Sequence, residues 1–320
     1  MMDQALFEIY ERNFPFNIRK KDTVLQILGH RDNVVLERRE EGKGLIGVSV
    51  IHRNAVLMLC VDGKYRNRGI GTQLLEKSEQ LVRERGFSEI VIGAGHDYLM
   101  PGVPTSRRYF QAENERLYEN LDESAVLFFE KRGYVHSWEC NCFDMMVSFN
   151  GQEKEDGGIS VSGDAEEGAP QAQGCRVGDQ ISGITYRWAQ QEDLRRICEC
   201  TQDACPEFTE YYQNESLYAK DSDERALIAV AQEGQVAGTL IVGVEDKEKQ
   251  IGSVGCTTVR RSFQGRHIAV NLVRIGTGHL RKMGMREAFL GYTYSGLDHL
   301  YGYAGYKIRV YYMMAKKALG

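Results

Sequence analysis

One stretch of the chain carries most of the information about its structure: Val56-Leu57-Met58-Leu59-Cys60-Val61, then Asp62-Gly63-Lys64-Tyr65, then Arg66-Asn67-Arg68-Gly69-Ile70-Gly71-Thr72. An apolar run typical of a buried strand leads into a basic turn with two glycines. Apolar residues at helical spacing from Leu74 to Val82 predict a helix after the turn. A strand, a glycine turn and a helix N-terminus together present free backbone N–H groups and a positive dipole end, which bind an anion.

The residues of this turn suit a diphosphate. Gly69 and Gly71 lack a Cβ, so the backbone can approach a phosphate closely. Arg66 and Arg68 add positive charge beside it. The stretch is not the dinucleotide-binding fingerprint, because no Gly-x-Gly-x-x-Gly occurs, and it is not a P-loop, because no Gly-Lys-Ser/Thr follows.

A second pattern lies further along the chain, where Ala125–Tyr134 predicts a helix that ends in Gly133-Tyr134. In order and spacing, the two patterns resemble the Arg/Gln-x-x-Gly-x-Gly/Ala loop and the Gly-Phe/Tyr helix end of the GNAT superfamily of N-acetyltransferases. In that family the loop holds the diphosphate of acetyl-CoA. The resemblance implies acetyl-CoA as co-substrate, bound in the first half of the chain by Leu59, Cys60, Val61, Arg66, Asn67, Arg68, Gly69, Ile70, Gly71 and Thr72.

Composition limits the class of protein. With 320 residues the chain fits two domains, and 42% hydrophobic with 27% charged residues is typical of a globular protein. No apolar run is long enough to cross a bilayer, and the first residues do not resemble a signal peptide. The eight cysteines include no Cys-x-x-Cys pair, so we expect no metal site and a reduced, cytoplasmic protein. A net charge of −5 disfavours nucleic acid as a partner.

A change of composition predicts a linker. Residues 151–180 hold seven acidic and two basic side chains, many glycines and no large hydrophobic cluster. Such a segment cannot bury enough apolar surface to fold alone. We therefore expect a domain over residues 1–150, an acidic Gly-rich linker over 151–180, and a second domain over 181–320.

The two predicted domains repeat one order of elements. Val34–Arg38 and Leu45–Val50 predict a hairpin before the first strand–turn–helix, and Ala226–Ala231 with Val236–Gly243 predict the same hairpin in the second half. The chain thus resembles tandem GNAT proteins. The predicted fold class is α/β (mixed α+β), with a mixed, mostly antiparallel central sheet flanked by helices in each domain.

The second copy of the loop differs from the first. Gln264, Gly265, Arg266 and Ala269 fit the family pattern, but His267 stands where the first glycine of the motif belongs. Three interpretations are open: the side chain blocks a phosphate, a protonated imidazole contacts the phosphate, or the loop has decayed.

For the second signature, the helix that ends in Gly-Phe/Tyr, it is the first half of the chain that departs from the family pattern. GNAT enzymes often protonate the departing CoA thiolate with a tyrosine four residues before the Gly-Phe/Tyr pair. That position holds Tyr301 in the second half and Phe129 in the first. A phenol with a pKa near ~10 suits a thiolate near ~8.5, whereas phenylalanine has no proton to donate. A core or surface aromatic is the alternative interpretation of Tyr301.

The remaining chemistry is less clearly marked. The resemblance implies that a backbone N–H of the strand Leu57–Val61, opened by a bulge, stabilises the oxyanion. His96 titrates near neutral pH and is a candidate proton relay, although loop histidines more often have no such role. Asp97, Asp298 and His299 are weaker candidates. Pro101-Gly102-Val103-Pro104 predicts a rigid turn and resembles a loop in the GNAT domains of some bacterial β-N-acetylglucosaminidases.

Three functional hypotheses follow. The first is an N-acetyltransferase that acts on a primary amine of a small molecule, with CoA bound by the N-terminal domain. The second places catalysis in the C-terminal domain around Tyr301. The third is a CoA-binding regulatory protein without transfer activity. Nothing in the sequence identifies the acceptor amine or the oligomeric state.

Overall fold

The computed structural model describes residues 2–93, 99, 101–107, 121, 123–136, 142–149, 183–294 and 296–320. The expected linker and His96 lie outside these residues. The described chain forms two compact units, each considered by itself: unit 1 is Met1–Asp144, Tyr292–Ser295 and Ile308–Gly320, and unit 2 is Met145–Gly291 and Gly296–Lys307. In the described part of the chain, no helix is both long and apolar enough to span a membrane.

The elements that lie wholly in unit 1 are, in chain order, α1 (Met2–Asn13), α2 (Lys21–Leu28), β1 (Asn33–Glu40), β2 (Gly44–His52), β3 (Ala55–Val61), the 3-10 turn η1 (Gly63–Tyr65), α3 (Ile70–Glu84), β4 (Glu89–Ile92), β5 (Val103–Thr105), α4 (Ser124–Glu130), β6 (Val135–His136) and β14 (Ala315–Ala318). Three strands have residues in both units: β7 (Cys142–Ser148), β12 (Glu287–Tyr294) and β13 (Lys307–Met313).

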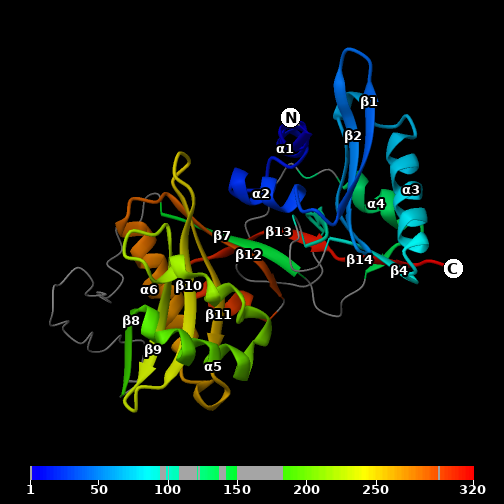
Figure 1. Cartoon of the computed structure of the whole chain (residues 1–320). Helices are drawn as coiled ribbons and strands as arrows, with labels where there is room; N and C mark the ends of the chain where they lie inside the picture. The colour runs from blue at the N-terminus through cyan, green and yellow to red at the C-terminus, as the bar shows by residue number, and fades with distance from the viewer. Residues whose placement is uncertain are drawn as a thin grey trace. The chain divides into compact units, whose positions relative to one another are not determined.

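The sheet of unit 1 has the order β1-β2-β3-β4-β14-β6, in which only the β3–β4 pair is parallel. Nearly every residue of β2 is buried, so the strand contributes apolar side chains to both faces of the sheet. Leu45, Val48 and Val50 pack with α1 and α2, whereas Ile46 and Ile51 pack on the side of α3. Figure 1 shows the helices on the two sides of these strands.

The strand β14 comes from the last residues of the chain. It fills the position between β4 and β6, and Ala315 faces both Ile92 and His136. The expected boundary assigned these residues to the second domain. Two short strands with open edges leave backbone groups that need partners, and the C-terminal residues 308–320 supply them in unit 1.

The elements that lie wholly in unit 2 are β8 (Ile184–Trp188), η2 (Gln191–Asp193), α5 (Leu194–Ala204), η3 (Pro206–Phe208), η4 (Tyr211–Gln213), η5 (Glu215–Tyr218), β9 (Glu224–Ala231), β10 (Val236–Asp246), β11 (Ile251–Val259), η6 (Arg261–Phe263), α6 (Ile268–Lys282) and α7 (Asp298–Gly302). Its strand order is β7-β12-β11-β10-β9-β8, with β11–β12 parallel and β8 to β11 antiparallel.

The two units repeat the same architecture, which confirms the predicted tandem fold of mixed α/β class. In each, a hairpin leads to a strand, a 3-10 turn, a 15-residue helix and a parallel strand. Side chains repeat as well. The Tyr134 hydroxyl donates to Glu79 on α3 at 3.1 Å, and the Tyr306 hydroxyl lies 3.2 Å from Thr277 at the same position of α6.

Candidate functional site

The first loop has the backbone expected of an anion site. Its residues Arg66 to Gly69 are exposed, and α3 begins directly after Gly69. Gly69 has φ +78°, in the left-handed region that favours glycine, and a Cβ built on it would meet nothing within 4 Å. The backbone conformation, rather than lack of space, therefore explains this glycine. The first N–H groups of α3 have no partner within the helix, as in any α-helix.

Arg66 has a structural role in this loop. Its Nε donates to the Val61 carbonyl at 3.0 Å and its Nη2 donates to Asn13 Oδ1 at 3.2 Å. These bonds tie the loop to the end of β3 and to α1. The guanidinium of Arg68 lies 5.3 Å from the centre of the Tyr65 ring, within the range of a cation–π contact.

Sequence reasoning missed a cation at this helix N-terminus. Arg132, which follows α4, donates from Nη2 to Thr72 Oγ1 at 2.7 Å and from Nη1 to the Phe128 carbonyl at 2.8 Å. Its guanidinium carbon lies 3.8 Å from the centre of the Phe128 ring. A positive charge held in the first turn of α3 adds to the attraction for a diphosphate. The only signal in the sequence is its place directly before Gly133-Tyr134.

The second loop adopts the same conformation as the first. Arg260, which directly precedes the 3-10 turn η6, has φ −51° and ψ 137°. Asp62, which precedes η1 in the first loop, has φ −52° and ψ 139°. His267 has φ +56° and lies directly before α6, as Gly69 lies before α3. Histidine is among the non-glycine residues that tolerate the left-handed region. The substitution of glycine by histidine thus leaves the geometry of the loop intact.

The supporting contacts of the second loop repeat those of the first. The Gln264 side chain donates to the Val259 carbonyl at 3.2 Å, as Arg66 does to Val61. Arg266 lies 5.2 Å from the Phe263 ring centre, as Arg68 does from Tyr65. Gly265 takes the positive-φ position of Asn67, and Ala269 lies in the first turn of α6. The residues of both loops therefore fit a diphosphate.

In unit 2 the strand that leads into the loop parts from its parallel neighbour. Within the described residues, the registered pairs of β3 with β4 end at Val56, before the predicted site residues Leu59, Cys60 and Val61. The pairs of β11 with β12 end at Ser253. Among the described residues, the backbone of β11 beyond Ser253 has no registered partner on its β12 side and is available to pair with an extended ligand. Burial raises the pKa of the Cys60 thiol to about 12, so it is not a nucleophile at neutral pH.

Both strands also carry irregularities in register. In β3 the shift leaves Leu57 as the extra residue opposite β2, inside the predicted bulge. In β11 the shift spans Cys256 and Thr257, and Cys256 has φ +50°. The Tyr212 hydroxyl donates to the Cys256 carbonyl at 2.8 Å, and the Tyr218 hydroxyl donates to the Tyr212 carbonyl at 2.6 Å. Tyr212 and Tyr218, which sequence reasoning missed, thereby hold the bulge in unit 2.

Tyr301 lies against this bulge. Its side chain is buried, and its hydroxyl donates to Thr257 Oγ1 at 3.2 Å. Burial raises the pKa of Tyr301 to about 12, partly opposed by the hydrogen bond to Thr257. The corresponding residues of unit 1 are Phe129, which is buried, and Leu59, and both belong to one hydrophobic cluster. A polar pair in unit 2 thus replaces an apolar pair in unit 1.

Two other candidates near Tyr301 have different surroundings. Asp298 is buried and accepts a hydrogen bond from the Gly296 N–H at 3.2 Å, a contact that stabilises the start of α7. The His299 side chain is 65% exposed and 3.9 Å from Asp298. His96 and Asp97 lie outside the described residues.

The Pro101–Pro104 segment is a bend at Pro101 and Gly102 that leads into a short strand. Val103–Thr105 forms β5 and pairs with β13 in unit 1. Glu123 fixes the end of this strand, because its carboxylate accepts from the Thr105 hydroxyl at 2.6 Å and from the Ser106 N–H at 2.6 Å.

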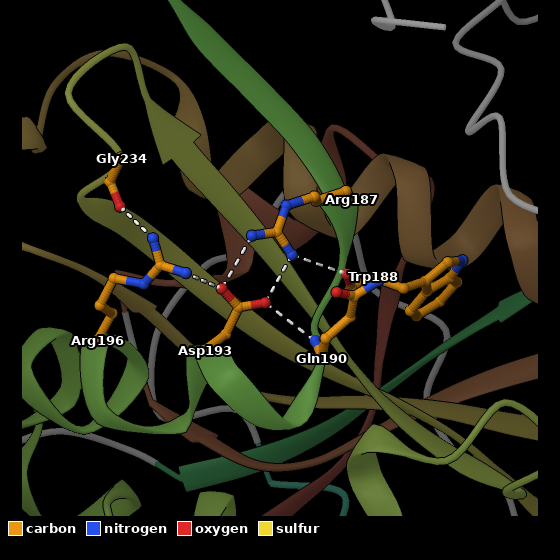
Figure 2. A network of polar contacts seen from close by, with 6 residues as sticks. All are labelled: Arg187, Trp188, Gln190, Asp193, Arg196 and Gly234. Atoms are coloured by element: carbon orange, nitrogen blue, oxygen red, sulfur yellow. Dashed lines mark hydrogen bonds and ion pairs between the residues drawn. The ribbon is translucent and has the colours of Figure 1, made fainter. Parts of the chain in front are cut away.

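A buried carboxylate in unit 2 has a structural role (Figure 2). Asp193, at the start of α5, accepts from Arg187 Nη1 at 2.6 Å and Nη2 at 2.8 Å, and from Arg196 Nη2 at 2.6 Å. It also accepts from the Gln190 N–H at 2.9 Å. All its acceptor capacity serves to join β8 to α5, so Asp193 is not a candidate catalytic group.

The comparisons with known proteins agree with this geometry. The model of the acetyltransferase (GNAT) family matches residues 4–99 and 188–299. No curated protein matches the chain. A tandem GNAT protein from the clavulanic acid biosynthesis pathway aligns with 99% of this chain and 95% of its own, at 13% identity and a TM-score of 0.69.

Two further solved structures share the fold. A GCN5-related N-acetyltransferase from Sphaerobacter thermophilus aligns with 98% of this chain and 92% of its own, at 17% identity and a TM-score of 0.64. The glucosamine N-acetyltransferase region of a fungal multi-domain GH3 β-N-acetylglucosaminidase gives a TM-score of 0.71 at 17% identity and 98% coverage of this chain, which spans 37% of that protein. The fold is that of an acetyltransferase. The chain belongs to the acetyltransferase (GNAT) family.

Proposed function

We infer that the protein is an acetyl-CoA-dependent N-acetyltransferase that acts on a primary amine of a small molecule. Acetyl-CoA supplies the activated acetyl group. The observation that carries the proposal is the Tyr301–Thr257 pair at the bulge of β11, 3.2 Å apart, in a unit that also has an intact loop before α6. A donor beside an opened strand, with a diphosphate loop at the end of that strand, is the minimum this transfer needs.

The roles follow from the geometry of unit 2. N–H groups in the opened part of β11 (Val254–Val259) are available to stabilise the oxyanion as the amine nitrogen bonds to the acetyl carbon. The carbon–sulfur bond then breaks, and the ammonium proton passes to solvent. Tyr301 donates a hydrogen bond to the sulfur as negative charge develops there, and the released thiolate takes up a proton from solvent. A phenol with a raised pKa remains protonated across the neutral range, as a donor must.

The first unit remains a second proposed site for CoA. Support comes from Gly69, from the exposed loop and from Arg132 on Thr72. Because Phe129 has no proton to donate, transfer in this unit would depend on solvent to protonate the thiolate. A unit that binds CoA without transfer would serve a regulatory role.

Matched loop variants separate these sites. Gly69→Trp and His267→Trp place the same bulky side chain at equivalent positions, directly before α3 and α6. Isothermal titration of acetyl-CoA into each variant and the double variant should show which loop binds. If unit 2 alone binds, only His267→Trp and the double variant lose binding. Equal affinity in all four proteins would mean that neither loop is the site.

The reaction is tested by release of the CoA thiol. An amine panel should contain D-glucosamine, because a solved protein of this fold is a glucosamine N-acetyltransferase, together with a polyamine, an α-amino acid and a peptide with a free N-terminus. We expect amine-dependent thiol release above the rate of hydrolysis, and an N-acetyl product by mass spectrometry. Thiol release without any acetylated amine would contradict the proposal.

A further inference from the structure

A cavity in unit 1, separate from both loops, is lined mainly by positive charge. Its volume is about 480 Å³, and its lining holds three arginines, Arg31, Arg53 and Arg85, against one acidic side chain, Asp32. All four residues belong to unit 1. With the one histidine of the lining neutral, the cavity carries a net charge of +2, whereas the whole chain carries −5. The volume is that of a small-molecule site, and the charge indicates an anion.

The cavity lies at the opposite end of α3 from the first loop. The loop directly precedes Ile70, the first residue of α3, whereas Arg85 directly follows Glu84, the last residue. A helix of 15 residues is about 22 Å long. A diphosphate held by the loop therefore does not reach this cavity.

Arg53 occupies a backbone position that does not favour arginine. Arg53 and Asn54 form the two-residue turn between β2 and β3, in which His52 pairs with Ala55. Arg53 has φ +53°. Glycine, asparagine and aspartate are the usual residues at positive φ in such turns, and a bulky side chain there is an outlier. Conformations of this kind cluster at functional sites, so the local structure alone does not explain this arginine.

Arg85 is anchored to the same turn. Its Nη1 donates to the Arg53 carbonyl at 3.1 Å, which holds two guanidinium groups at one cavity. Within the described part of the chain, neither arginine forms an ion pair with a carboxylate. Arg85 caps the end of α3, and the residue that caps α6 in unit 2 is Met283. The fold therefore does not require a charge here, and an anion would relieve the repulsion between the two arginines.

The rest of the lining suits an organic molecule. Val34 and Phe87 are partly exposed and supply apolar surface. The Asn33 amide nitrogen donates to the Ile27 carbonyl at 2.7 Å, and the Asn33 Oδ1 lies 3.0 Å from His52 Nδ1. Since that oxygen only accepts, Nδ1 carries the proton of the neutral His52 ring. Nε2 becomes a further donor to an anion when the ring is protonated.

We propose that Arg53 and Arg85 bind the phosphate group of a small phosphate monoester in this cavity. Such a group carries a charge of about −1.5 to −2 at neutral pH, which balances the lining, whereas a single carboxylate would leave one arginine uncompensated. The planar guanidinium fork donates paired hydrogen bonds to phosphate oxygens. The carbon skeleton of the ester would lie against Val34 and Phe87. This site is independent of the transfer proposed for unit 2, because it involves neither loop nor Tyr301.

Calorimetric titration of the full-length protein in phosphate-free buffer tests the site. The ligands are inorganic phosphate, D-glucose 6-phosphate and phenyl phosphate, with D-glucose as the uncharged control. The variants are Arg53→Asn and Arg85→Met. Arg39→Met, on β1 but outside the cavity, is the control for loss of a positive charge. We expect at least one ester to bind more tightly than inorganic phosphate, and about tenfold or more weakly to Arg53→Asn and to Arg85→Met than to the wild type or Arg39→Met.

Both cavity variants should fold. Asparagine tolerates the left-handed region better than arginine does, so Arg53→Asn should unfold at or above the wild-type temperature. Arg85→Met introduces the residue that unit 2 has at the equivalent position, Met283. Acetyl-CoA affinity should not change in either variant, because both loops are untouched. Weaker ester binding at unchanged stability and unchanged acetyl-CoA affinity is a result that a purely structural role would not give.

Three results would overturn this proposal. One is equal ester affinity in the wild type, Arg53→Asn and Arg85→Met. Another is that neither ester binds to the folded wild type. The third is binding to phosphatidylcholine vesicles that contain phosphatidate without binding of either soluble ester, which would assign the charge to a membrane surface. Failure of the proposed function would show separately, as absence of amine-dependent thiol release, and would leave the ester titrations unaffected.

Discussion

The stability of unit 1 should depend on Lys317, a lysine of the C-terminal strand β14. Lys317 on β14 lies 2.9 and 3.0 Å from the two oxygens of Glu79, whose side chain on α3 is 9% exposed. The same carboxylate accepts from Tyr134 at 3.1 Å and lies 3.6 Å from Arg83. Lys317→Met keeps the length of the side chain and leaves Glu79 buried with an incomplete set of partners.

The cost can be worked from these contacts. Removal of one member of a buried ion pair costs about 3–5 kcal/mol. Since the Lys317 side chain is 26% exposed and Arg83 remains nearby, we expect a loss of about 2–3 kcal/mol in the opening free energy of unit 1. The control is Lys316→Met. Lys316 pairs with Glu89 at 3.1 Å, and both side chains are about 40% exposed. Its replacement by methionine should therefore cost at most about 1 kcal/mol.

Native-state hydrogen exchange is the suitable assay, because a chain of two units need not unfold in one step. In Lys317→Met, amides of β4 and β14 should exchange about 30- to 140-fold faster, while those of β10 in unit 2 keep their rates. The double variant Glu79→Gln/Lys317→Met should recover part of the loss, because the uncompensated charge is gone. Equal effects of Lys316→Met and Lys317→Met would refute the reasoning.

Three further predictions concern single positions. Gly102→Ala places a Cβ 2.5 Å from the Met313 carbonyl oxygen and should cost about 2–3 kcal/mol in thermal unfolding, whereas Gly63→Ala, which meets nothing within 4 Å, should be nearly neutral. Gly238→Ala places a Cβ 2.9 Å from Ile268 and 3.0 Å from a strand carbonyl; it should displace the start of α6 and weaken acetyl-CoA binding to unit 2, and unchanged affinity there would count against the loop. Burial alone would raise the pKa of Asp193, but its hydrogen bonds and two arginines lower it below the usual value. Its contribution is therefore fully present above the unfolded pKa near ~3.9 and is lost below it. Asp193→Asn should cost about 2–3 kcal/mol at pH 7 and progressively less in urea titrations below pH 4; a constant difference would contradict this.

The features that could be predicted from the sequence are those coded by neighbouring residues. The loop around Gly69 follows from an apolar run, two glycines and a helical pattern within about twenty positions. The tandem fold follows from the recurrence of that pattern. These elements appear in the structure because local propensity and burial favour the same conformation.

The features that could not be predicted depend on residues far apart in the chain. Ala315–Ala318 has no pattern that assigns it to the sheet of unit 1, since the unpaired edges of β4 and β6 are properties of the folded unit. Arg132 reaches Thr72 across sixty positions, and Asp144 meets Tyr312 across 168. The backbone conformation of His267 could not be predicted either, because histidine adopts the left-handed region only where its surroundings favour it.

The central claim is that transfer depends on Tyr301 in unit 2, and steady-state kinetics with acetyl-CoA and a competent amine test it most directly. Phe129→Tyr, at the equivalent buried position of unit 1, is the matched control. The account predicts that Tyr301→Phe lowers kcat about 100-fold with little change in the KM for acetyl-CoA, since the donor acts as the sulfur leaves, and that Phe129→Tyr leaves kcat unchanged. Wild-type turnover by Tyr301→Phe would contradict it.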